Sequence, residues 1–131
     1  MVNHWHLLLW PHNDGDVSRF LHRLTGTHAM RYRRQTKTVC EGAVYQSRFR
    51  AVGVLDSLHF LRACRYIERN PVEAHLVKRA EEWRWSSARQ RAMAPDVVLP
   101  MDDGPMPLPE NWLAVVNNEQ DFAPGELVTP Q

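Results

Sequence analysis

The chain lacks any apolar run long enough to cross a membrane, which excludes a membrane-spanning protein. Its most apolar stretch, residues 7–10, is only a few residues long and follows histidines rather than lysines. We therefore expect neither a signal peptide nor a membrane anchor. Cysteine is also scarce. Cys40 and Cys64 show none of the spacings typical of metal sites, and both are expected to be reduced thiols in a cytoplasmic protein.

Basic residues are absent from both ends of the chain. All 16 Lys and Arg residues lie between Arg19 and Arg91, which gives residues 1–94 a net charge of +8. Residues 95–131 hold seven acids, no base and seven of the nine prolines, and have a net charge of −7. The basic part suggests a polyanionic partner, although arginine-rich, solvated helices would give the same count. The sequence thus predicts a domain at 1–94 and an acidic, proline-rich tail at 95–131.

The order of apolar and turn-forming residues predicts an α+β domain. Residues 2–10 have the pattern of a strand, and residues 43–54 have that of a strand or a bent hairpin. Helices are expected at about 17–34 and 57–70 and, more briefly, at 72–80. Asp14 or Asp16 can cap the first helix, and Pro71 is expected to end the second. One docking turn is expected in the tail, at 112–116.

His4 and His6 form a pair at the start of the chain. In a strand, side chains two residues apart point to the same face, so both imidazoles can approach one ion while Trp5 faces the opposite layer. Neutral imidazole is a common metal ligand, and two of them leave coordination positions open for substrate oxygens. A His-x-His pair near a chain start is, however, often incidental.

The helix expected at 57–70 carries Tyr66 at the edge between its apolar and polar faces. On a helical wheel Phe60, Cys64 and Ile67 form the buried stripe, and the arginines of this helix lie on the far side. Asn70 follows Tyr66 by one turn on the same edge. A tyrosine so placed can act as a covalent nucleophile, or it can be a boundary aromatic whose hydroxyl reaches water.

Taken together, these features provide the three classes of group that cleavage of a phosphodiester requires. A cation neutralises the charge, a nucleophile is placed in line with the scissile bond, and basic groups hold the strand. The histidine pair, the edge tyrosine and the arginine-rich body supply one class each.

Five ordered motifs across residues 2–90 resemble the REP-associated tyrosine transposases, a branch of the single-tyrosine, IS200-like family. Residues 108–113 show a weaker resemblance to the same family. The motifs are Asn-His-Trp-His-Leu-Leu at 3–8, Ser-Arg-Phe-Leu-His-Arg-Leu-Thr-Gly at 18–26, Val-Tyr-Gln-Ser-Arg-Phe at 44–49, Cys-Arg-Tyr-Ile-Glu-Arg-Asn-Pro at 64–71 and Trp-Arg-Trp-Ser-Ser at 83–87.

This resemblance implies the fold of the His-hydrophobic-His (HUH) endonucleases, a ferredoxin-like antiparallel sheet with helices on one face. His4, His6 and Asn70 would hold Mg²⁺ or Mn²⁺ beside the scissile phosphate of single-stranded DNA. Tyr66 would attack that phosphate, giving a 5′-phosphotyrosine link and a free 3′-hydroxyl, and reversal onto another end would join strands. The family's substrates are REP-like imperfect palindromes that fold as hairpins, which implies a cytoplasmic, nucleoid-associated protein.

The resemblance also suggests where DNA would be contacted. Tyr45 or Trp85 could stack on an unpaired base, although core packing would also explain each of them. Helical arginines are often simply solvated, but six of the arginines are candidates for phosphate contacts: Arg19, Arg23, Arg48, Arg50, Arg65 and Arg69.

Members of this family carry a first strand, a helix and a second strand before the histidine strand. The sequence therefore suggests a chain that starts inside the family's domain. It would be a truncated, inactive form, a chain whose start is misassigned, or one that completes its sheet in a homodimer. Enzymatic activity thus stays uncertain at this point. One alternative function is a non-catalytic protein that binds hairpin DNA. A weaker alternative is a metalloenzyme unrelated to DNA, for which no Asp or Glu is convincingly placed.

Overall fold

The computed structural model describes residues 4–38, 42–93, 100–102 and 104–120. The chain forms two compact units, one made by residues 9–53 and the other by residues 1–8 together with 54–131. We call them the helical arm and the main unit and describe each by itself. The predicted boundary between residues 94 and 95 lies outside the described residues and stays a prediction.

The helical arm is built on one long helix, α1 (Asp16–Thr36), which confirms the helix expected at 17–34. It begins after Gly15, whose positive φ of 80° turns the chain. The expected cap by Asp14 or Asp16 is not observed, because Gly15 holds the capping position and no side chain caps the helix start. Asp16 lies in the first turn instead, where its carboxylate accepts a hydrogen bond of 2.8 Å from the Asn13 amide and pairs with Arg19 at 2.6 Å. The hydrogen bond from Asn13, and then the one from Arg19, lowers the pKa of Asp16. The helix ends at Lys37, which has left-handed backbone geometry.

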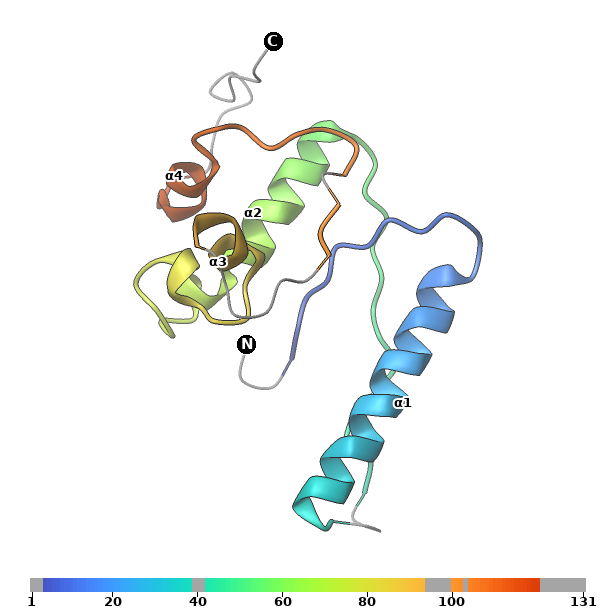
Figure 1. Cartoon of the computed structure of the whole chain (residues 1–131). Helices are drawn as coiled ribbons and strands as arrows, with labels where there is room; N and C mark the ends of the chain where they lie inside the picture. The colour runs from blue at the N-terminus through green and yellow to red at the C-terminus, as the bar shows by residue number, and fades with distance from the viewer. Residues whose placement is uncertain (1–3, 39–41, 94–99, 103, 121–131) are drawn as a thin grey trace. The chain divides into compact units, whose positions relative to one another are not determined.

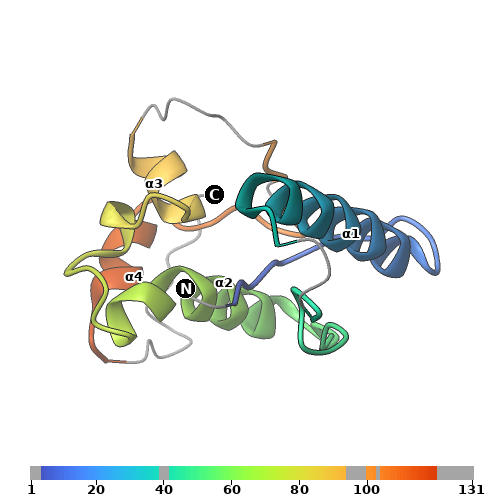
Figure 2. The same ribbon diagram turned by 90° about the horizontal axis from the view of Figure 1, so that it is seen from below.

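The rest of the helical arm is irregular. Residues 42–53 return alongside α1 as a segment without regular secondary structure (Figure 1). Tyr45 fastens this segment to the helix by a hydrogen bond of 2.8 Å between its hydroxyl and Nδ1 of His28. Figure 2 shows α1 as one uninterrupted helix, although Gly26 lies near its middle. Only Leu21 of this helix is buried.

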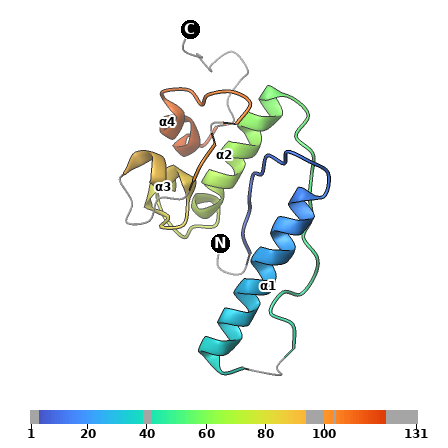
Figure 3. The ribbon, with the colours of Figure 1, turned by 45° about the vertical axis from the view of Figure 1, so that its right-hand side comes forward.

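The main unit packs three further α-helices and a short 3₁₀ helix around one core. In chain order they are α2 (Ser57–Glu73), η1 (Ala80–Glu82), α3 (Ser87–Ala92) and α4 (Trp112–Asn117). Both α4 and η1 contact α2, and α3 packs on η1. Figure 3 shows the segment that leads into α4 passing the N-terminal end of α2. The buried apolar side chains of this core are Phe60, Leu61, Cys64, Ala80, Ala88, Trp112 and Val116.

The ends of α2 follow from local chemistry. Asp56 caps its start, because the carboxylate accepts a hydrogen bond of 2.8 Å from the His59 amide. The prediction that the helix ends at Asn70 was wrong by three residues, since Pro71 lies inside α2. Proline removes a single backbone donor in the last turn, and its buried ring packs in the main unit. The helix expected at 72–80 is also not observed, because residues 74–79 hold turns and bends and the short η1 begins only at Ala80.

The expected ferredoxin-like antiparallel sheet is contradicted. Within residues 4–38, 42–93, 100–102 and 104–120 there is no strand. Residues 4–10 and 43–54 have no regular secondary structure, and residues 44–47 form bends. Alternating apolar residues indicate an extended backbone, but a strand exists only where a second strand supplies hydrogen-bond partners. Neither segment has such a neighbour. Residues 5 and 7–10 consequently keep more than a third of their surface exposed.

The segment from residue 104 to 120, predicted as part of the tail, contributes to the core of the main unit. Trp112 and Val116 of α4 are buried, which confirms the docking turn expected at 112–116. A search of the described helices found none with the length and apolar character needed to span a membrane.

Candidate functional site

The extended residues 4–8 and helix α2 bring His6 and Tyr66 together in the main unit. The two ring centroids are 5.4 Å apart, with the rings edge to face. The His4 ring meets His6 in the same manner, at 5.1 Å. Two histidines from the start of the chain therefore lie beside a tyrosine that follows them by sixty residues.

His6 occupies a partly buried position within this cluster. Burial lowers the pKa of His6, and repulsion from the neighbouring His4 imidazole adds to this effect. Its Nε2 atom is buried and has no hydrogen-bond partner among the described residues. The lowered pKa favours the neutral imidazole. This is the form in which histidine binds a metal ion.

Tyr66 projects from the outer face of α2. Its side chain is 60% exposed, so the phenol reaches solvent while one edge contacts His6. The exposure follows from the helical period, because Phe60, Leu61 and Cys64 turn the opposite face of α2 into the core. An accessible hydroxyl on a packed helix can meet a large substrate such as a nucleic acid strand.

Asn70 lies one turn after Tyr66 on α2 and is partly buried. Its backbone carbonyl accepts from the amide of Ala74, which closes the last turn of the helix. The part of the chain that the structure describes contains no group of three or more His, Cys, Asp and Glu residues that could hold a metal ion. A metal at the His4–His6 pair would consequently need an amide oxygen, or substrate oxygens, as further ligands.

Arg65 and Arg69 lie on the inner side of α2, although the helical wheel placed them on its far, solvated side. Each is only 8% exposed. Arg65 donates to the carbonyl oxygens of Val115, Asn118 and Gln120, at 3.1, 2.7 and 2.9 Å. Arg69 donates to the carbonyls of Val116 and Asn118 and also pairs with Glu73. The two guanidinium groups thus supply donors to carbonyls at the end of α4, which lack partners within that helix.

Glu68 is a third buried charge on α2, and its structural role was not expected from the sequence. Its carboxylate accepts from Nε1 of Trp112 at 2.8 Å, from the Ser87 hydroxyl and from Arg91. These donors come from α4 and α3, so one carboxylate joins three helices. The motif around Tyr66 therefore has two faces, an outer one with the tyrosine and an inner one that fixes the helix.

The remaining arginine candidates all lie in the helical arm. Arg19 and Arg23 are exposed on α1, and Arg48 and Arg50 are exposed on the returning segment. Residues 9–53 contain eight Lys and Arg against three Asp and Glu. The exposed positive charge of the predicted interface is therefore found in this unit rather than beside Tyr66 on α2.

Comparison with protein families gives a match. A family described as IS200-like transposases matches residues 1–70, slightly more than half of the chain. The matched region ends at Asn70 and includes His4, His6 and Tyr66. No curated protein matches the chain. No solved structure matches it either.

Proposed function

The chain belongs to the IS200-like transposase family, and we propose that it is a metal-dependent nuclease and strand transferase acting on single-stranded DNA. The observation that carries this proposal is the contact between His6 and Tyr66. A metal ligand and a tyrosine nucleophile must act on the same phosphate, and these two side chains are neighbours despite their separation in sequence. Transposition of DNA is the function of the family.

The residues beside Tyr66 fit a divalent cation such as Mg²⁺ or Mn²⁺. His6 offers a neutral imidazole with an unpartnered nitrogen, and His4 lies next to it. Asn70 would supply an amide oxygen as the third ligand, and the remaining positions would be filled by phosphate oxygens and water. When bound, the cation would neutralise charge on the scissile phosphate.

Tyr66 would carry out the covalent step. Its hydroxyl oxygen attacks the phosphorus, the bond from phosphorus to the 3′-oxygen breaks, and the strand's 5′ end stays linked to the tyrosine. The phenolic proton is lost to solvent, and the departing 3′-oxygen takes up a proton. One phosphoester bond replaces another, so attack by a new 3′-hydroxyl on the phosphotyrosine can join two strands.

The substrate would be a single strand with a hairpin, of the REP-like kind that the resemblance implies. Arg19, Arg23, Arg48 and Arg50 would contact its phosphates from the helical arm. Arg65 and Arg69 are not included in this interface, because backbone carbonyls already occupy their donors. Their contribution would be to hold the helix that presents Tyr66.

The proposal is tested by incubating the purified full chain with Mn²⁺ and a labelled hairpin oligonucleotide. A covalent adduct should form that survives denaturing electrophoresis. Tyr66→Phe should abolish it, and His6→Ala should reduce it by about a hundred-fold or more. Tyr32→Phe and His12→Ala are matched controls, since both residues are exposed on the helical arm and should leave the adduct unchanged.

An adduct that persists in Tyr66→Phe would remove this tyrosine from the role of nucleophile. Salt-sensitive binding of the hairpin without any adduct would instead support the non-catalytic alternative, a hairpin-binding protein derived from a transposase.

A further inference from the structure

A groove runs along α1 where the returning segment of the helical arm faces the helix. The α1 residues that line it are His22, Thr25, Gly26, Ala29 and Arg33, whose spacing of three or four places them on one face. Ala43, Val44 and Tyr45 line the opposite side. The groove is shallow and open to solvent, and it offers a volume of about 320 Å³. The space over Gly26 is open, because a Cβ built there would meet nothing within 4 Å.

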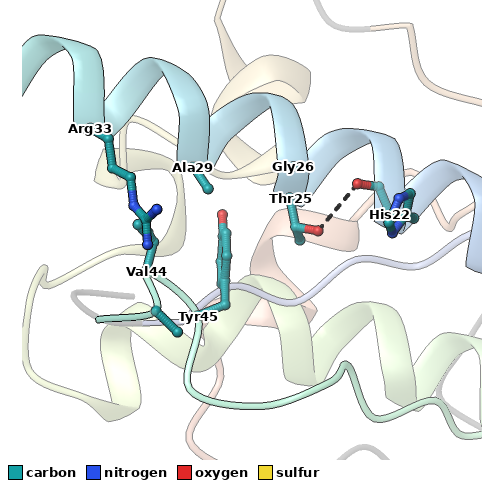
Figure 4. A pocket seen from close by; sticks show the side chains of 8 residues that line it. His22, Thr25, Gly26, Ala29, Arg33, Val44 and Tyr45 are labelled. Carbon is teal, nitrogen blue, oxygen red and sulfur yellow. Dashed lines mark hydrogen bonds between the residues drawn. The ribbon is translucent and has the colours of Figure 1, made fainter. Parts of the chain in front are cut away.

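Tyr45 gives the groove an aromatic wall. Figure 4 shows its ring between Arg33 and Thr25, with the hydroxyl directed toward α1. The ring is held by the hydrogen bond to His28 and by an aromatic contact with the same imidazole, at 5.7 Å between centroids. A ring already fixed in place loses little conformational entropy when a planar group stacks on it.

Polar groups lie along the same groove. Arg33 donates one guanidinium bond to the Gly42 carbonyl, while its Nε is buried without a hydrogen-bond partner among the described residues. The Thr25 hydroxyl donates to the Leu21 carbonyl at 2.7 Å and can therefore only accept from a ligand. His22 is exposed, and its imidazole adds ring nitrogens that can donate or accept a hydrogen bond. A cation, an aromatic wall and a hydrogen-bond acceptor together suit a group that is planar, polar at its edge and attached to an anion.

The surroundings of the groove are positively charged. The helical arm has a net charge of +5, and its acids are few. Such a field raises the local concentration of a polyanion. Among ligands that carry a planar polar group and a negative charge, a nucleotide within a DNA strand meets both requirements.

We propose that this groove binds one unpaired nucleotide of single-stranded DNA, with its base stacked on Tyr45 and its phosphate paired with Arg33. The inference rests on the proposed function in that the ligand is a single strand, and it assigns recognition of an unpaired base to a site in the helical arm. In a duplex, neighbouring bases stack on both faces of each base and pairing occupies its edge, so duplex DNA would not enter the groove.

The test measures binding by fluorescence anisotropy, in a Tyr66→Phe background so that no covalent chemistry contributes. Two labelled strands of about 12 nucleotides are compared, one of deoxythymidine and one of abasic sites with the same phosphates. The Tyr66→Phe protein should bind the deoxythymidine strand about ten-fold more tightly than the abasic strand. Tyr45→Leu should bring this ratio close to one, whereas Tyr45→Phe, which keeps the ring, should preserve most of it.

Two further variants keep the test independent of folding defects. Gly26→Leu places a side chain in the groove and replaces glycine by a better helix former, so it should fold well and still lose the base preference. Trp85→Leu removes an exposed aromatic from the main unit and should leave the ratio unchanged.

Equal binding of the two strands, or a base preference that survives both Tyr45→Leu and Gly26→Leu, would overturn the groove as a base site. If the preference for the strand with bases were lost in Trp85→Leu and kept in Tyr45→Leu, the base would be recognised outside the groove. That result would also overturn the groove as a base site. These results are independent of the adduct assay. An adduct without a Tyr45-dependent preference refutes only the groove, and a Tyr45-dependent preference without an adduct refutes only the proposed chemistry.

Discussion

Gly104 is the residue whose identity the main unit constrains most directly. Its φ of 74° is unfavourable for any side chain, and a Cβ there would lie 2.7 Å from the Phe60 ring. We expect Gly104→Ala to lower the free energy of unfolding by about 2 kcal/mol or more, because backbone strain and steric overlap add. Urea denaturation followed by tryptophan fluorescence measures the change.

Gly26→Ala is the matched control for that substitution. A methyl group at Gly26 has open space and the helix there has ordinary geometry, so this variant should gain about 0.5–1 kcal/mol in stability. If Gly104→Ala were as stable as the unaltered chain, the described path of residues 104–106 past Phe60 would be wrong.

Cys64 should be an inert thiol. Desolvation by burial, reinforced by the negative charge of Glu68, raises its pKa to about 11. Little thiolate is then present at pH 8, and the thiolate is the reactive form. In a Cys40→Ser variant, an aromatic disulfide reagent should label Cys64 only as fast as the main unit opens, with the rate rising in urea. Immediate labelling at pH 8 without urea would contradict its burial.

At the scale of elements, the inward-facing charged side chains of α2 form hydrogen bonds that hold this helix against α3 and α4. Glu68 is 2% exposed and accepts a bond from Trp112, so Trp112→Phe keeps most of the ring but removes a donor from a buried carboxylate. This change should cost about 1–3 kcal/mol of unfolding free energy. Trp85→Phe makes the same chemical change at a position that is 75% exposed, and should cost less than about 0.5 kcal/mol. Equal effects would show that the bond to Glu68 contributes nothing.

Glu81 links η1 to α4 and predicts a pH dependence. Burial raises the pKa of Glu81, but hydrogen bonds from Asn117 and Arg79 outweigh it, and the net shift is downward. A lowered folded-state pKa means that the ionised form contributes stability above the ordinary glutamate pKa. That contribution is lost as the pH falls through the folded value.

Glu81→Gln should therefore be less stable than the unaltered chain at pH 7 and should approach it at pH 3. Denaturation curves at the two values provide the comparison. Glu110→Gln, at an exposed position, reports the general effect of removing one negative charge. A difference between Glu81→Gln and the unaltered chain that is the same at both pH values would contradict this account.

The helices were largely predictable from the sequence, whereas the segments that pack on each helix or would pair with each strand were not. Periodic apolar residues and the Asp56 cap define α1 and α2 locally, which is why both were found within a few residues. A strand depends on a distant segment, so the pattern of residues 2–10 could not show whether a neighbour exists. The inward position of Arg65 likewise depends on carbonyls fifty residues away, at the end of α4. From its charge alone, Arg65 was expected to face solvent. The carbonyl oxygens that accept its hydrogen bonds become apparent only from the packing of α4 on α2.

Part of the candidate site could also be read from the sequence. The spacing of His4 and His6, and the edge position of Tyr66, predicted a shared site, and the structure places His6 beside Tyr66. The groove on α1 was missed. Its signal was the small residues at 26 and 29, in line with His22 and Arg33 on one helical face. Its aromatic wall comes from a separate segment, which a helical pattern cannot place.

For the molecule as a whole, the two units have different proposed roles: the main unit carries the catalytic residues, and the helical arm binds DNA. The main unit holds His6 and Tyr66 together and buries the charges that fix α2. The helical arm carries exposed arginines and the groove. Binding of a single strand should therefore weaken steeply as salt is raised, whereas the covalent step should depend on the main unit.

The central claim is that Tyr66 becomes covalently attached to DNA. The most direct measurement is mass spectrometry of the unaltered chain after incubation with Mn²⁺ and a hairpin oligonucleotide, followed by nuclease and trypsin digestion. Cleavage after Arg65 and Arg69 releases a short peptide containing Tyr66, and the account predicts a nucleotide phosphate on that peptide. Attachment at Tyr32 or Tyr45, or an unmodified Tyr66 peptide in a sample whose DNA has been cleaved, would contradict it.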